Sequence, residues 1–224
     1  MTPMTTLTTA PLKPLLDRLF EQADAAETET IAAVAGISDQ ERVRLRQSKT
    51  DYRDLYARLK HVPIAVSRET GALLYMLARS SGARDIVEFG TSFGISTLHL
   101  AAGLRDNGGG RLITSEFEPS KVARARDHLT AGGLIDLVDI REGDALQTLS
   151  VNLPDTIDLV LLDGAKALYP EILKLVESRL RPGAFIVADN ADDSPDYLAH
   201  VRAPANGYLS TPFAEDVELS MRLG

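Results

Sequence analysis

Three oxygen-bearing residues follow two apolar segments and could together hold a cation. Asp163 comes directly after residues 157–162, and Asp189 and Asn190 come directly after residues 184–188. Both segments are predicted strands of one parallel sheet, so these side chains should meet where the strands end. Carboxylate and amide oxygens, with no His or Cys among them, suit Mg²⁺, or another divalent cation such as Mn²⁺ or Ca²⁺, better than zinc. An ordinary polar turn would explain either segment alone, but the pair favours a metal site.

Lys166 follows Asp163 by three residues, in the segment DGAK, and is a candidate base. Beside a divalent cation its ammonium would be destabilised and its pKa lowered. A neutral amine at this place could accept a proton from a hydroxyl group bound nearby. The alternative is an ordinary surface lysine.

The segment EFGTSFGIS, residues 88–96, follows the predicted first strand, residues 85–89. Gly90 permits a tight turn and close approach of a ligand, and Gly94 lets the next helix begin against the strand. The acid-x-G-x-x-x-G spacing differs from the dinucleotide pattern G-x-G-x-x-G, whose second glycine makes room for a pyrophosphate. The segment therefore suits a nucleoside ligand without phosphate, although packing alone would also explain an isolated pair of glycines.

Two further features lie at the ends of the next two predicted strands. Glu116 follows residues 111–115, where doubly wound folds place an acid against ribose hydroxyls. Gly143, Asp144 and Ala145 follow residues 137–141, where an adenine ring could lie against the backbone. An ordinary strand-end carboxylate would explain Glu116 alone, but three such features on successive strands indicate one nucleoside site.

Helices are predicted before and between these strands, which gives an α/β fold. Their predicted ranges are residues 12–26, 39–60, 67–81, 96–104, 119–130 and 169–180. Residues 207–210 and 217–223 are predicted strands without a strong helix between them, and the second alternates apolar and polar residues. The sequence therefore predicts a mostly parallel seven-stranded sheet, with helices on both faces and an antiparallel pair of strands at the C-terminus.

Composition excludes several classes of protein. The 224 residues carry a formal net charge of -8, which disfavours a nucleic-acid partner, and the chain has no cysteine for a thiolate metal site. No segment approaches the length of a membrane span, and the Thr-rich residues 1–10 have no basic start, so a secretory signal is not expected. We expect a cytoplasmic protein with a mobile tail at residues 1–10.

From about Val66 to the C-terminus the chain resembles the cation-dependent O-methyltransferases, a family that includes catechol O-methyltransferase. The resemblance is carried by EFGTSFGIS, by the segment from Asp163 to Lys166 and by Ala188-Asp189-Asn190. It implies a class I methyltransferase fold of Rossmann-like type, S-adenosylmethionine as methyl donor and a small-molecule acceptor. The family has bulky aromatic residues where this chain has Gly164-Ala165, which implies a more open pocket here.

The resemblance also implies roles for individual residues. Asp163, Asp189 and Asn190 would bind the metal, and Lys166 would be the catalytic base beside Asp163. The methyl donor would be bound along its whole length by residues of the first four strand ends and the segment before them: Val66, Glu88, Gly90, Thr91, Gly94, Ser96, Glu116, Asp144, Ala145 and Asp163.

Residues 1–62 are predicted to form a tail and helices for capping or dimerisation, and residues 63–224 the domain that binds S-adenosylmethionine. A homodimer is the expected assembly. Three alternatives remain: a metal-independent methyltransferase acting on nitrogen or oxygen, a nicotinamide-dependent oxidoreductase, and a non-catalytic binding module.

Overall fold

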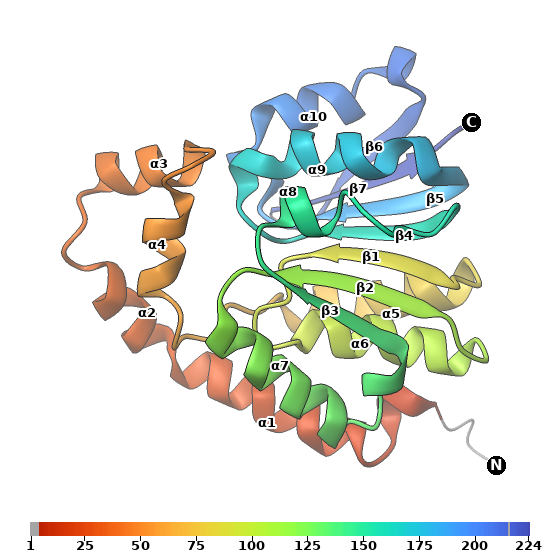
Figure 1. Cartoon of the computed structure of the whole chain (residues 1–224), viewed down its shortest axis with the longest axis horizontal. Coiled ribbons are helices and arrows are strands. Elements are labelled where there is room, and N and C mark those ends of the chain that lie inside the picture. The colour runs from red at the N-terminus through yellow and green to blue at the C-terminus, as the bar shows by residue number, and fades with distance from the viewer. Residues whose placement is uncertain (1–4, 215) are drawn as a thin grey trace.

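The computed structural model describes residues 5–214 and 216–224, and its centre is one seven-stranded sheet (Figure 1). The strand order is β3-β2-β1-β4-β5-β7-β6, in which β1 to β5 are parallel and β7 is antiparallel to β5 and β6. The strands are β1 Asp85–Phe89, β2 Arg111–Glu116, β3 Val138–Glu142, β4 Ile157–Leu162, β5 Leu180–Ala188, β6 Tyr208–Phe213 and β7 Val217–Arg222. The predicted fold class, including the antiparallel pair at the C-terminus, is confirmed.

Both faces of the sheet are covered because its central strands are apolar on both sides. In β4, Leu159 and Leu161 face one core cluster, whereas Val160 and Leu162 face the other, as the two-residue period of a strand requires. The helices of the first face are α1 Leu12–Ala25, α5 Arg68–Ser80, α6 Ile95–Asp106 and α7 Pro119–Ala131. Those of the second face are α8 Ala145–Thr148, α9 Tyr169–Val176 and α10 Pro195–Val201.

Three shorter helices lie beyond the carboxyl ends of the parallel strands (Figure 1). They are α2 Glu27–Val34, α3 Asp39–Gln47 and α4 Tyr52–Arg58. The predicted single helix at residues 39–60 is therefore wrong. The chain turns at Ser48, whose hydroxyl accepts hydrogen bonds from the backbone N–H of Thr50 at 3.3 Å and of Asp51 at 2.9 Å, a local alternative to helical bonding.

The start of the described chain also differs from the predicted mobile tail. Residues 1–4 lie outside the described residues, but Thr6–Thr8 forms a short 3-10 turn. The backbone N–H of Thr6 lies 3.1 Å from both carboxylate oxygens of Asp106, and its hydroxyl donates to the same carboxylate at 2.5 Å. This turn therefore docks on the end of α6. None of the helices in the described part of the chain is long and apolar enough to cross a membrane.

Candidate active site

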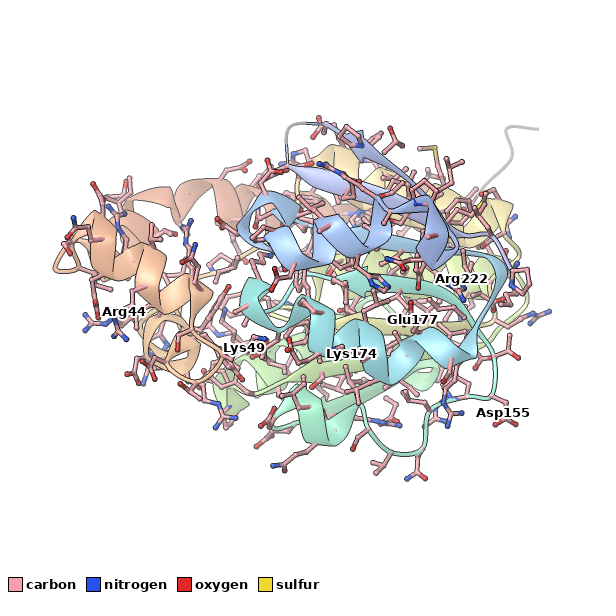
Figure 2. All side chains as sticks on the ribbon, turned by 90° about the horizontal axis from the view of Figure 1, so that it is seen from above. Arg44, Lys49, Asp155, Lys174, Glu177 and Arg222 are labelled. Atoms are coloured by element: carbon pink, nitrogen blue, oxygen red, sulfur yellow. The ribbon has the colours of Figure 1, made fainter. Side chains whose placement is uncertain are left out.

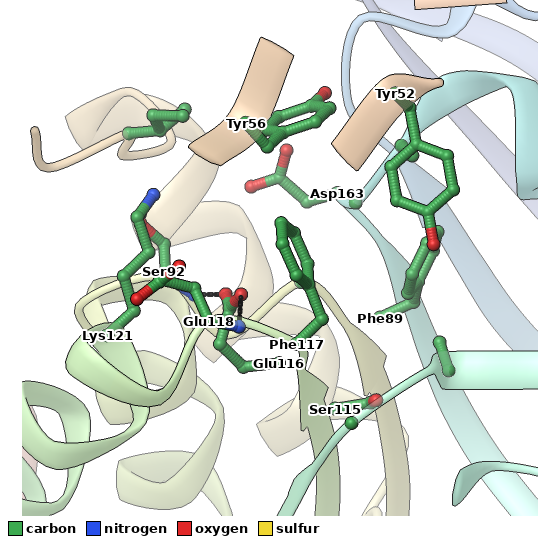
Figure 3. Close-up of a pocket in the computed structure, with 16 residues that line it drawn as sticks. Tyr52, Tyr56, Phe89, Ser92, Ser115, Glu116, Phe117, Glu118, Lys121 and Asp163 are labelled. Atoms are coloured by element: carbon green, nitrogen blue, oxygen red, sulfur yellow. Dashed lines mark hydrogen bonds between the residues drawn. The ribbon is translucent and has the colours of Figure 1, made fainter. Parts of the chain in front are cut away.

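Two neighbouring pockets lie where the parallel strands end. The inner pocket lies between the ends of β1, β2, β3 and β4 and helix α4 (Figure 3). The outer pocket lies between α2, α3, α4 and the ends of β4 and β5. Tyr56, Ile64 and Asp163 line both pockets. A ligand in each pocket would therefore meet the other ligand at Asp163.

Glycines bring the loops of this site close together. Gly90, which has a φ of 104°, leaves so little space that a Cβ there would lie 2.6 Å from the carbonyl oxygen of Asp163. At Gly164 a methyl group would overlap the ring of Phe89. The Gly164-Ala165 pair was predicted to open the pocket, but the Phe89 ring occupies the space beside Gly164.

Several predicted donor contacts form the buried support of the loop after β1. Glu88 has no exposed surface, and the hydroxyls of Ser96 and Thr97 each donate to its carboxylate at 2.6 Å. The hydroxyl of Thr91 lies 2.6 Å from that of Thr114 inside the sheet. None of these described side chains lines the inner pocket, so their predicted contact with a donor stays a prediction.

The burial of Glu88 has a consequence for the stability of the protein at different pH values. Burial, only partly offset by the hydroxyl donors, raises the pKa of Glu88 from 4.5 to about 7. The folded protein therefore holds this proton more tightly than the unfolded chain does. As a result, the free energy of unfolding falls as the pH rises from 4.5 to about 7.

Glu88→Gln is expected to remove this pH dependence. Relative to the unsubstituted protein, the variant should gain stability between pH 5 and pH 8, on the order of 3 kcal/mol in total. Urea unfolding at several pH values measures the difference, and two curves that stay parallel over the range would contradict the prediction.

The remaining predicted donor residues have different surroundings. Glu116 lines the inner pocket, and its carboxylate accepts hydrogen bonds from the backbone N–H of Ser92 at 2.9 Å and of Glu118 at 3.0 Å. Ala145 also lines this pocket, whereas the carboxylate of Asp144 pairs with Arg53 of α4 at 2.8 Å.

Two more predicted residues lie away from this cavity. Gly94 begins α6 and faces Ala125, and Val66 is buried in the core of the first face. Their assignment to donor binding stays a prediction.

Two of the three predicted metal ligands, Asp163 and Asp189, lie beside Lys166, and the third, Asn190, directly follows Asp189. The ammonium of Lys166 lies 2.9 Å from a carboxylate oxygen of Asp163 and 3.9 Å from one of Asp189, and these three side chains are 7 to 14% exposed. Asn190 adopts a left-handed conformation with a φ of 46°, and its amide donates to Asp216 at 2.6 Å. Within residues 5–214 and 216–224 there is no group of three or more His, Cys, Asp or Glu side chains placed for a metal.

The charges at this place fit a cation. Burial, together with the neighbouring Asp163 carboxylate, raises the pKa of Asp189 to about 8. Burial alone would lower the pKa of Lys166, but Tyr169 and the carboxylates of Asp163 and Asp189 outweigh it and hold the pKa well above its usual value. The lowered pKa was predicted for Lys166 beside a bound divalent cation, and it stays a prediction. Two crowded carboxylates and one amide are the hard oxygen donors that a divalent cation prefers, so these residues fit such an ion.

Helix α4 supplies site residues that the sequence did not reveal. Tyr52 and Tyr56 lie one turn apart and both line the inner pocket, with Tyr52 6.1 Å from the Phe117 ring in an edge-to-face arrangement (Figure 3). Their spacing of four residues was the available signal, but it equally fits a helix that packs on a core. Lys121 of α7 also lines this pocket and was not predicted.

Ion pairs connect α3 and α4 to the other elements of the site. Arg53 of α4 pairs with Asp144, and the ammonium of Lys49, in the turn between α3 and α4, lies 2.5 Å from Glu171 of α9. Arg46 of α3 lies 3.4 Å from a carboxylate oxygen of Asp193. Because exposed ion pairs contribute little to stability, these pairs mark where the two helices lie against the site and are not what holds them there.

Sequence comparison gives three results. A family model described as a methyltransferase domain matches residues 87–191. The chain is 37% identical over 130 residues to a catechol O-methyltransferase of Niastella koreensis, a match that covers 57% of this chain and 58% of that protein. It is 33% identical over 173 residues to catechol O-methyltransferase B of Danio rerio, which covers 74% of this chain and 64% of that protein. The matched region thus spans less than two thirds of either relative.

Solved structures agree on the fold. An O-methyltransferase from Bacillus cereus, determined in complex with SAH, superposes with a TM-score of 0.63 at 22% sequence identity, covering 90% of this chain and 100% of that one. A methyltransferase from Geobacter sulfurreducens gives a TM-score of 0.62 at 25% identity, covering 88% and 97%.

Proposed function

Because the chain belongs to the family of catechol O-methyltransferase-like methyltransferases, we propose that it transfers a methyl group from S-adenosylmethionine to a hydroxyl of a small molecule, with a divalent cation such as Mg²⁺. One observation carries the proposal: Asp163 lines both the inner and the outer pocket, with Lys166 beside it. A donor in the inner pocket and an acceptor in the outer one would meet at this point.

The residues that line the inner pocket match the chemical groups of the donor. Phe117 and Ala145 provide an apolar surface for an adenine ring, and Glu116 at the end of β2 lies where ribose hydroxyls would be bound. Gly90 also lines this pocket, and its lack of a side chain lets the loop after β1 lie against the backbone of Asp163. These residues fit S-adenosylmethionine without the pyrophosphate space of a dinucleotide site.

The reaction needs an oxygen nucleophile placed in line with the donor methyl group. The S–CH₃ bond breaks as the new O–CH₃ bond forms, the donor leaves as a neutral thioether, and the acceptor's proton passes to the nitrogen of Lys166. Lys166 must first lose its own proton, and a cation held by Asp163 and Asp189 would favour that loss because it would replace the ammonium as their counter-charge. Asp163, Asp189 and Asn190 would hold the cation, which when bound lowers the pKa of the acceptor hydroxyl and orients it.

The outer pocket indicates an amphipathic acceptor. Its walls include Val34, Leu55, Leu59, Ile64 and the ring of Tyr56, and its polar end carries Asp163, Lys166 and Asn190. An aromatic ring with neighbouring hydroxyls matches this division between apolar and polar surface. The helices of residues 1–62 would then cap the acceptor, in keeping with the ion pairs of α3 and α4.

Removal of metal tests the proposal directly. Treatment with EDTA is expected to lower methylation of phenolic acceptors by more than about tenfold, and added Mg²⁺ should restore it, because the acceptor hydroxyl loses its Lewis acid. Mass spectrometry of the product, for a gain of one methyl group, measures the effect. The rival is a metal-independent methyltransferase, which the ion pair of Lys166 with Asp163 favours, since it balances charge without a metal. Activity that survives EDTA would establish the rival.

A further inference from the structure

Lys121 is a buried cation to which the proposed reaction gives no role. It lies on α7, is 3% exposed and lines the inner pocket (Figure 3). Its ammonium lies 5.7 Å from the centre of the Phe93 ring and 3.5 Å from the hydroxyl of Ser92, the upper limit for a hydrogen bond. Burial lowers the pKa of Lys121, against the attraction of nearby Glu116 and Glu118.

The two acids closest to this lysine are engaged elsewhere. Glu116 accepts the backbone N–H groups of Ser92 and Glu118, and Glu118 accepts the hydroxyl of Ser120 at 2.8 Å. Among the residues that the structure describes, no carboxylate forms an ion pair with Lys121. Because a buried charge is costly unless it is paired, the pocket is complementary to a ligand with an anionic group.

The position of Lys121 identifies which part of a donor it would meet. It lies across the pocket from Tyr52 and Phe89 (Figure 3). Tyr52 contacts Phe117, and the adjacent Arg53 pairs with Asp144 at the end where the adenine is expected. Lys121 therefore lies toward the opposite end, where the methionine part would be, and the methionine carboxylate is the one anionic group of S-adenosylmethionine.

We propose that Lys121 is a donor-binding residue whose ammonium binds the methionine carboxylate of S-adenosylmethionine. The inference rests on the proposed function, because it requires this donor in the inner pocket. It goes beyond the predicted donor contacts, none of which supplies a positive side chain. The competing role is structural: Lys121 would only balance the charges of Glu116 and Glu118.

Calorimetric titration with two ligands separates these roles. S-adenosylmethionine and its decarboxylated analogue differ in the carboxylate, and each is titrated into the unsubstituted protein and into Lys121→Met. We expect the substitution to weaken binding of S-adenosylmethionine by about 10- to 100-fold, the range for a charge-assisted hydrogen bond, and binding of the analogue by less than about twofold. Lys174→Met, an exposed lysine on α9, is the matched control and should change neither affinity (Figure 2).

Each other outcome decides against the inference. Equal weakening of both ligands would assign Lys121 to the shape or charge balance of the pocket, and unchanged affinity for S-adenosylmethionine would remove it from the site. Should Lys121→Met fail to fold, the unsubstituted protein still decides, because affinities for the two ligands within about twofold of each other would leave no place for this contact. Failure of the unsubstituted protein to bind S-adenosylmethionine at all would instead contradict the proposed function.

Discussion

Lys166→Met is expected to lower kcat by about 10²- to 10⁴-fold while affinity for S-adenosylmethionine stays nearly unchanged. The ammonium of Lys166 lies 2.9 Å from Asp163, at the junction of the two pockets, where the acceptor hydroxyl must lose its proton. Methionine keeps the length of the buried side chain but cannot accept a proton. Lys166 does not line the inner pocket, so donor binding should not depend on it.

The same variant should also bind Mg²⁺ more tightly, whereas its turnover distinguishes a base from a merely structural lysine. Removal of a positive charge from between Asp163 and Asp189 should tighten Mg²⁺ binding, because the ion no longer competes with the ammonium. Turnover at saturating Mg²⁺ and the half-saturating Mg²⁺ concentration are measured together, with Lys174→Met as the control. Turnover near that of the unsubstituted protein with metal bound would contradict the assignment of Lys166 as the base.

The sheet was predictable from the sequence because its strands have strong local signals. Residues 159–162 form an apolar run that suits a strand covered on both faces. The alternation after Val217 correctly indicated an antiparallel strand, but β7 lies between β5 and β6, and its polar residues Glu218 and Ser220 are buried instead of exposed. The carboxyl ends of parallel strands share one edge, so the order of the strands alone was enough to place Asp163 and Asp189 together. The parallel arrangement of β4 and β5 therefore brings together two residues that are far apart in the sequence.

The helices before the sheet were less predictable because their ends depend on side chains that compete with the helix for backbone hydrogen bonds. Hydrogen bonds of the Ser48 hydroxyl end α3 in a segment whose charged residues continue a helical pattern. Helix α2 has little amphipathic pattern, and α10 is only seven residues long, so neither was predicted. The same helices bring Tyr52 and Tyr56 over the pocket, which depends on tertiary packing that no local pattern specifies.

The sequence predicted where the buried carboxylates lie, but it did not predict whether they carry a charge. Glu88 and Asp189 both follow from strand ends, but their raised pKa values come from burial, which the sequence does not give. The pKa of Lys166 could not be predicted from the sequence either, because burial lowers it and the neighbouring Tyr169 and carboxylates raise it by more. Charge state at this site is therefore a property of the packed fold.

Asp189→Asn is expected to abolish the stimulation by Mg²⁺, with a loss of activity greater than about a hundredfold, and yet to stabilise the metal-free protein at high pH. Burial and the Asp163 carboxylate raise the pKa of Asp189 from 3.8 to about 8. The folded protein binds this proton more tightly than the unfolded chain does, so stability falls as the pH rises from about 4 to about 8. Asparagine has the shape of the protonated side chain and does not titrate. The stability of the variant should therefore fall less than that of the unsubstituted protein as the pH rises.

The opposite signs of the two effects make the prediction specific to a metal ligand. Thermal unfolding with EDTA, at pH 5 and pH 9, should show the variant matching the unsubstituted protein at the lower pH and exceeding it at the higher one. The same measurement with Mg²⁺ should raise the melting temperature of the unsubstituted protein alone, because an ion that binds only the folded state stabilises it. A variant that Mg²⁺ still stabilises to the same extent would show that Asp189 does not bind the ion. A carboxylate kept buried beside another despite the cost at neutral pH is what a cation site requires, since the bound ion offsets the repulsion between the two.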